Sequence, residues 1–168
     1  MYAVQRRRPD LQVTRVAEVS HACVGVDVLV TATASTEPLV MKPWLAPGVH
    51  VNAVGADDPT KAELSAECLE RADRIVVDSR VLTAVHGDLA RAGNVRHDVV
   101  ELGEVLSGSA VGRQGDDDIT VCKLIGLGVQ DLAAAEITLD LLHRGARVPG
   151  PAPASAIDIR QTGLAVQS

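Results

Sequence analysis

The chain has 168 residues, which is long enough for one domain with a hydrophobic core of its own. Hydrophobic residues make up 46% of the chain, which excludes a disordered protein, and the formal net charge of −6 argues against non-specific nucleic-acid binding. The start of the chain has three arginines but no apolar stretch of the signal-peptide type behind them. No apolar run approaches the roughly 20 residues that a membrane-spanning helix needs.

The three cysteines, Cys23, Cys68 and Cys122, lie far apart and form no spacing typical of a metal site. Three widely spaced cysteines in a chain of this size are typical of a reducing compartment. We therefore expect a cytoplasmic protein with no metal site and with neither nucleic acid nor membrane as a partner.

Apolar, β-branched runs predict strands at residues 26–33, 49–54, 75–78 and 119–125. Continuous runs such as the first three are typical of parallel strands that are buried on both faces. Helical patterns are predicted between and after these strands, at residues 63–72, 81–92, 102–106 and 129–144. Strands that alternate with helices predict an α/β fold, here a Rossmann-like parallel sheet with flanking helices.

The front of the chain departs from the usual order of a dinucleotide-binding fold, which opens with a strand, a glycine-rich turn and a helix. No GxGxxG motif precedes the first predicted strand, and the later GLGVQD segment at residues 126–131 is interpreted as a tight strand-to-helix turn. We therefore expect residues 1–148 to form a partial dinucleotide-binding domain that lacks the first strand and the glycine-rich loop. Residues 149–168 are rich in proline and alanine, which predicts a disordered tail.

Two adjacent carboxylates, Asp57 and Asp58, follow the second predicted strand. The carboxyl ends of parallel strands face the ligand crevice, so Asp57 is placed where a ligand would lie. Asp58 precedes Pro59, which favours the first helical position, and is therefore predicted to cap the helix that follows. A carboxylate beside a low-dielectric crevice can have a raised pKa and exchange protons, which makes Asp57 a candidate acid or base; a solvated loop acid is the alternative. Lys61 is either a partner for a phosphate or carboxylate, or a solvated lysine.

Five ordered blocks of this chain resemble the ornithine cyclodeaminase/mu-crystallin family over about residues 13–144. The blocks are VTATASTEP, WLAPGVHVNAVGADDPTKAEL, RIVVDSR, GEVLSGSAVGR and DDDITVCKLIGLGVQDLAAA. The resemblance implies an enzyme that uses NAD or NADP and either deaminates or cyclodeaminates an amino acid or reduces an imine such as a ketimine. It further implies a small amino-acid or imine substrate and, for a complete enzyme, a homo-oligomer.

The resemblance also implies roles for individual residues. Asp57 stands at the position of the family's acid/base aspartate, which would move protons at the amine, the imine or the attacking water. Ile125 would lie next to the substrate, and Leu124 stands where the family usually has a serine. The cofactor contacts of the family fall on Thr33, Val51, Asn52, Ala53, Val54, Lys61 and Leu124.

Family members carry a substrate and dimerisation domain and a glycine-rich phosphate loop before the segment that this chain resembles. The resemblance therefore covers the C-terminal, NAD(P)-binding half, and we expect a truncated gene product, a mis-chosen start or a remnant. The alternative function is a non-catalytic binding or association module that keeps the fold without turnover.

Overall fold

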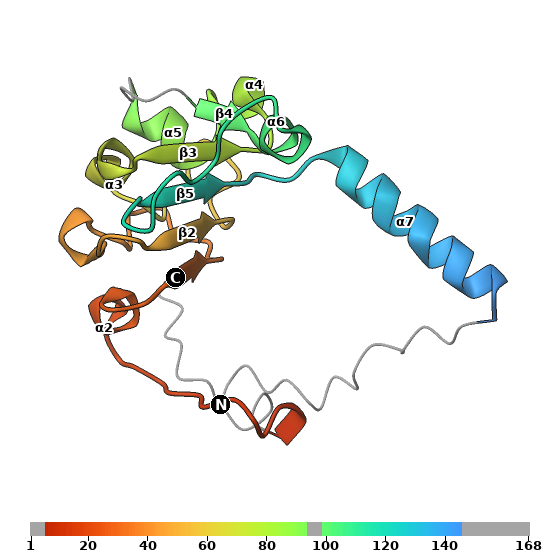
Figure 1. The fold of residues 1–168 in the computed structure, drawn as a ribbon, viewed down its shortest axis with the longest axis horizontal. Coiled ribbons are helices and arrows are strands. Elements are labelled where there is room, and N and C mark those ends of the chain that lie inside the picture. Colours follow the sequence, from red (N-terminus) through yellow and green to blue (C-terminus); the bar gives the residue numbers. More distant parts are fainter. Residues whose placement is uncertain (1–5, 94–98, 146–168) are drawn as a thin grey trace. The chain divides into compact units, whose positions relative to one another are not determined.

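A computed structural model describes residues 6–93 and 99–145. Five parallel strands form one sheet in the order β1-β2-β5-β3-β4 (Figure 1). The strands are β1 Val28–Thr31, β2 His50–Ala53, β3 Arg74–Val77, β4 Val99–Glu101 and β5 Thr120–Lys123. The predicted α/β class with a parallel sheet is confirmed, whereas β4 was not predicted because its run is too short to stand out. The predicted tail at residues 149–168 lies outside the described residues.

The helices connect these strands in alternation. They are α2 Val19–Cys23, the 3-10 helix η1 Lys42–Trp44, α3 Ala66–Arg71, α4 Arg80–Thr83, α5 Gly87–Ala92, α6 Leu102–Ser107 and α7 Gly128–His143. The helix predicted at residues 81–92 is in fact two helices. Gly87 has φ +69°, and a Cβ there would overlap the Ala56 carbonyl oxygen, so the chain turns at this glycine instead of continuing as one helix.

The helix predicted at residues 63–72 starts later than expected. Leu64 forms a parallel bridge with Val40, and the Ser65 amide donates to the Val40 carbonyl, so residues before Ser65 are extended. Ser65 occupies the N-cap position of α3. The prediction that Asp58 caps this helix is therefore wrong, because a backbone pairing with a distant segment overrides the local helical pattern.

The two faces of the sheet differ in cover. One face packs against Cys68 and Leu69 of α3 and Leu89 of α5, and it contributes the buried side chains of Leu29, Val51, Ala53, Ile75 and Val77. On the opposite face, Val28 and Val30 of β1 are 57% and 60% exposed. Burial on both faces was predicted for the strands at residues 26–33, 49–54 and 75–78. This prediction is wrong for β1, β2 and β3, where buried residues alternate with more exposed ones. β5, for which it was not predicted, has four buried residues.

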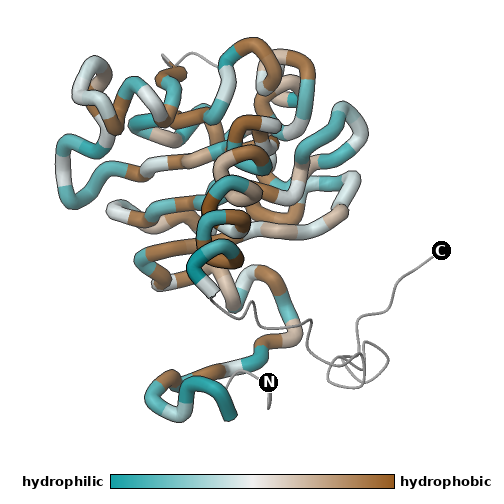
Figure 2. Tube along the Cα trace, turned by 90° about the vertical axis from the view of Figure 1, so that its right-hand side faces the viewer, coloured by the Kyte–Doolittle hydropathy of each residue, from teal (hydrophilic) through white to brown (hydrophobic). Residues whose placement is uncertain are grey.

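The chain divides into two compact units, one of residues Val16–Gly128 and one of Met1–Arg15 with Val129–Ser168. The first unit contains the whole sheet. In the second, α7 has no buried residue, and apolar side chains recur along it, among them the exposed Leu132, Ile137 and Leu142 (Figure 2). Among the described residues, no helix is long and apolar enough to cross a membrane.

Candidate functional site

The residues predicted to form the site follow three neighbouring strands. β2 pairs with β1 on one side and with β5 on the other, so the carboxyl ends of these strands meet at one edge of the sheet (Figure 1). Thr33 follows β1, the loop with Asp57 and Lys61 follows β2, and Leu124 and Ile125 follow β5. In α/β folds this edge of the sheet is where ligands bind.

Asp57 and Lys61 form an ion pair on the loop after β2. Lys61 Nζ donates to Asp57 Oδ1 at 2.6 Å, with 48% of the Asp57 side chain and 26% of the Lys61 side chain exposed. This hydrogen bond lowers the pKa of the Asp57 carboxyl and raises that of Lys61. The expectation of a raised Asp57 pKa is therefore wrong, because the hydrogen bond from the Lys61 ammonium outweighs the partial desolvation of the carboxylate. An ionised Asp57 can accept a proton at neutral pH.

Asp58 organises the loop itself. Its Oδ1 accepts hydrogen bonds from the Thr60 amide at 2.7 Å, the Thr60 hydroxyl at 2.6 Å and the Lys61 amide at 3.1 Å. Such side-chain-to-backbone bonds stabilise a turn in the way that a cap stabilises a helix start. The two adjacent acids share Lys61 unequally. Asp58 holds the turn and its Oδ2 lies 3.7 Å from Lys61 Nζ, whereas Asp57 makes the 2.6 Å contact with the same ammonium group.

The four predicted cofactor contacts on and after β2 point in different directions. The side chains of Val51 and Ala53 are fully buried in the core, so only their main chain is left for a ligand. Asn52 is half-buried on the opposite face, where its Oδ1 lies 3.3 Å from His50 Nε2. Val54 is 37% exposed, directly before the loop that contains Asp57.

Leu124 and Ile125 are both half-buried at the end of β5. The amides of Ile125 and Gly126 donate to Asp78 Oδ2 at 2.9 and 2.7 Å, which ties the end of β5 to the end of β3. Leu124 and Asn52 line the same cavity of about 410 Å³ on the less covered face of the sheet. Two residues that were predicted to contact a cofactor therefore share one cavity.

Sequence reasoning missed a glutamate beneath the loop. Glu63 is completely buried, and its two oxygens accept four hydrogen bonds. Oε1 accepts from the amide and hydroxyl of Thr33 at 2.6 and 2.8 Å, and Oε2 accepts from the Thr31 hydroxyl and the Gly55 amide, both at 2.8 Å. Burial works to raise the pKa of Glu63, but the hydrogen bonds outweigh it and leave the pKa below its ordinary value. Thr33 therefore already uses its amide and hydroxyl hydrogens within the protein.

A buried charge pair, Asp88 and Lys123, adjoins Glu63. Asp88 Oδ1 accepts from the amides of Glu63 and Leu64 at 2.6 and 2.9 Å, while its Oδ2 lies 3.5 Å from Lys123 Nζ. Lys123 Nζ donates to the Ala53 carbonyl at 3.2 Å, and the side chains of Asp88 and Lys123 are both fully buried. We call Glu63, Asp88 and Lys123 the buried network. Its one sequence signal is a lysine inside the apolar run ITVCKLI, since charged residues are almost never fully buried without a partner.

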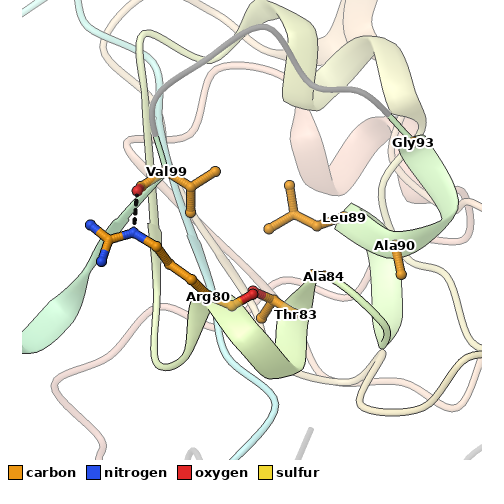
Figure 3. A pocket seen from close by; sticks show the side chains of 7 residues that line it. All are labelled: Arg80, Thr83, Ala84, Leu89, Ala90, Gly93 and Val99. Atoms are coloured by element: carbon orange, nitrogen blue, oxygen red, sulfur yellow. Dashed lines mark hydrogen bonds between the residues drawn. The ribbon is translucent and has the colours of Figure 1, made fainter.

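Another cavity, of about 300 Å³, lies among α4, α5 and β4 (Figure 3). Arg80 borders it and donates from Nε to the Val99 carbonyl at 2.8 Å, and its guanidinium also pairs with Glu104. The remaining lining is mostly apolar, with Leu89 and Val99 facing each other across it (Figure 3). None of the predicted site residues borders this cavity.

Comparison with known proteins decides the family. The model of the ornithine cyclodeaminase/mu-crystallin family matches residues 2–145. The chain belongs to this family. Among its relatives, the alanine dehydrogenase of Archaeoglobus fulgidus is 39% identical over 129 residues, which are 74% of this chain and 39% of that protein.

Solved structures of the ornithine cyclodeaminase/mu-crystallin family share the fold of this member. A probable ornithine cyclodeaminase from Bordetella pertussis Tohama I superimposes with a TM-score of 0.76 at 35% identity, over 88% of this chain and 49% of that one. An archaeal alanine dehydrogenase dimer with bound NAD gives a TM-score of 0.74 at 32% identity, over 88% of this chain and 48% of the other. The chain therefore spans about half the length of these solved relatives and about two fifths of the A. fulgidus enzyme.

Proposed function

We propose that this chain supplies the nicotinamide side of an NAD(P)-dependent active site that acts on the carbon–nitrogen bond of a small amino acid or cyclic imine. The observation that carries the proposal is the Asp57–Lys61 pair at 2.6 Å on the edge of the sheet where the ends of β1, β2 and β5 meet. Family membership supports the reaction class, because the relatives named above include dehydrogenases and cyclodeaminases of amino acids.

In this proposal Asp57 is the proton acceptor. Lys61 lowers the pKa of its carboxyl, so Asp57 is ionised at neutral pH and ready to take a proton from a substrate ammonium or from an attacking water. Lys61 is held by Asp57 and by the turn around Asp58, so its charge stays beside the reacting group. The same ion pair disfavours a protonated Asp57, so the resting loop suits deamination better than it suits proton donation to an imine.

The residues present fit the nicotinamide end of the cofactor. A bound NAD or NADP would supply hydride exchange with the substrate carbon, beside Asp57, Lys61, Val54 and the Leu124 cavity. Among the described residues, no glycine-rich turn of the GxGxxG type follows β1 to receive the pyrophosphate. We therefore expect this chain by itself to bind NAD(H) and NADP(H) with a Kd above about 1 mM, as measured by titration calorimetry. Micromolar binding would contradict this expectation.

A chimera tests the proposed chemistry. This chain replaces the aligned 129-residue segment of the A. fulgidus alanine dehydrogenase, and NADH formation from alanine is followed. Asp57→Asn should lower kcat by at least about 100-fold while the melting temperature stays nearly unchanged, because the amide keeps the shape but cannot accept the proton. Glu104→Gln is the matched control, since it also removes one carboxylate charge from an ion pair but lies outside this loop, and it should keep most of the turnover.

Two results would overturn the proposal. One is a chimera that folds and binds NADH but shows no turnover. The other is an Asp57→Asn chimera that keeps the kcat of its parent, which would remove Asp57 from the chemistry.

A second candidate function, association without turnover, is favoured by one observation. Val28 and Val30 are more than half exposed on β1, which is an edge strand of the described sheet and carries no charged residue. Uncharged, β-branched edge strands tend to pair with other chains. Val30→Lys should therefore convert self-associated protein to monomer in analytical ultracentrifugation, whereas Val81→Lys, at an exposed valine of α4, should not. A wild-type chain that sediments as a monomer rules this candidate out.

A further inference from the structure

We infer that Glu63 is a positioning residue: its carboxylate fixes the loop that bears Asp57 and Lys61 against Thr33 at the end of β1. The inference rests on the proposed function of Asp57 and goes beyond it, because Glu63 lies in the core and touches no reacting group. Three features of the structure lead to it: the position of Glu63 in the loop, the pattern of its donors and the closeness of the two strand ends.

The first feature is the position of Glu63 at the end of the loop that it closes. Its Oε2 accepts from the Gly55 amide at 2.8 Å, so one side chain joins the first and last residues of the segment between Gly55 and Glu63. Asp57 and Lys61 lie inside this closed segment, each two residues from one of its ends. Opening the bond between Gly55 and Glu63 would release the Gly55 end of this segment from its Glu63 end.

The second feature is the pattern of donors, which only a carboxylate satisfies. Each Glu63 oxygen accepts one backbone amide hydrogen, Oε1 from Thr33 and Oε2 from Gly55. A glutamine has one NH₂ group, and in either flip this group would face one of these two amides, donor against donor. The threonine hydroxyls can rotate to adapt, but the backbone amides cannot. A buried donor without an acceptor destabilises the state in which it is buried, so a glutamine should release either Thr33 or Gly55.

The third feature is the close approach of the two strand ends. A Cβ at Gly55 would overlap the backbone of Thr33 and the Glu63 carboxylate, so no side chain larger than hydrogen fits between the ends of β1 and β2. The backbone of Glu63 is itself fixed, because its amide donates to the buried carboxylate of Asp88. Glu63 therefore links the exposed loop to the core: its backbone is bonded to Asp88, and its carboxylate is bonded to Thr33 and Gly55. We expect the distance between Thr33 and Asp57 to depend on these bonds.

The direct test follows Asp57 in the protein as it is, without a cofactor. Carbon-13 NMR titration of the Asp57 carboxyl in wild type should give an apparent pKa below the ordinary aspartate value, because Lys61 is held beside it. In Glu63→Gln the apparent pKa should rise toward the ordinary value as the loop opens. Thr31→Val removes one hydroxyl donor to Glu63 and leaves both backbone bonds, so it should fold and shift the Asp57 pKa in the same direction by less. Glu104→Gln is the matched control: it breaks the ion pair with Arg80 and should leave the Asp57 titration unchanged.

The outcomes are separable. If Glu63→Gln folds and Asp57 titrates as in wild type, Glu63 does not position the loop. If Glu63→Gln fails to fold, Thr31→Val decides: an unshifted Asp57 titration overturns the inference, and a small upward shift supports it. If Glu104→Gln shifts the Asp57 pKa as much as Glu63→Gln does, the effect is general destabilisation and the inference fails.

The catalytic consequence is tested in the alanine dehydrogenase chimera. A misplacement of about 1 Å can lower a rate by about 100-fold, so Glu63→Gln should lower kcat by about 10- to 100-fold and change the KM for alanine less. If Asp57→Asn leaves the chimera active while the NMR titrations shift as expected, the proposed role of Asp57 fails and the positioning by Glu63 stands. If Asp57→Asn is inactive but Glu63→Gln keeps full kcat, the role of Asp57 stands and Glu63 is only a structural residue.

Discussion

Glu63 and Asp57 are two carboxylates of one loop, and they sit in opposite environments. Glu63 is fully buried and accepts four hydrogen bonds, while the Asp57 side chain is 48% exposed and has one cationic partner, Lys61. Both pKa values lie below the ordinary values, yet for different reasons: an ammonium group for Asp57, and neutral donors that outweigh burial for Glu63. A lowered pKa alone therefore does not distinguish a reactive carboxylate from a structural one. Exposure and the kind of partner distinguish them.

The largest effect on stability is expected when one charge is removed from the buried network. Lys123→Met keeps the length of the side chain but leaves the Asp88 carboxylate buried without its cation, which should destabilise the fold by about 3–5 kcal/mol in urea unfolding. The double variant Lys123→Met/Asp88→Asn should recover part of this loss, because no uncompensated charge then remains. If the loss of unfolding free energy in the double variant equals the sum of the losses in Lys123→Met and Asp88→Asn, the two residues are not a coupled pair.

A smaller effect on stability is expected for Glu63→Gln, and this effect should depend on pH. The folded-state pKa of Glu63 is lowered, so its contribution to stability is complete above the unfolded value near 4.5 and is lost as the pH falls through the folded pKa. At pH 7, Glu63→Gln should cost about 1–3 kcal/mol of unfolding free energy. The gap in unfolding free energy between variant and wild type should narrow as the pH falls from 7 to below about 4.5 in urea unfolding. A gap that is constant across this range would show that the charge of Glu63 does not matter.

The smallest effect on stability is expected for the exposed ion pair of Asp57 and Lys61. Asp57→Asn and Lys61→Met each break an exposed ion pair, and such pairs contribute little to stability. We expect differential scanning calorimetry to show melting temperatures within about 2 °C of wild type for both. A larger drop for Asp57→Asn would assign Asp57 to the folding of the loop and not to proton transfer.

Several elements were predictable from the sequence because their signals are local. The apolar runs of β1, β2, β3 and β5 mark strands, and their alternation with helices is enough for the parallel α/β class. The helical pattern at residues 81–92 stops just before Gly93, and Gly93 follows α5 with φ +71°. The ordered blocks between residues 13 and 144 indicated the family, and the family model matches residues 2–145.

Other features were not predictable because their causes lie far away in the chain. Leu64 has a helical pattern around it but pairs with Val40, so α3 starts at Ala66. One face of β1 was predicted to be buried, but Val28 and Val30 are exposed there, because no described element covers them. A run of valines indicates that a strand can be buried and not which of its faces another element covers.

Four of the five strands, their parallel arrangement, the family and the position of Asp57 after β2 could be predicted from the sequence, since each depends on residues that are neighbours in the chain. Only the tertiary structure decided which of the nearby carboxylates is buried. Glu63 lies in a segment with a helical pattern, yet the donors to its carboxylate are Thr31, Thr33 and Gly55. A buried charge is stable only where several donors converge, and here they converge because β1 and β2 end side by side.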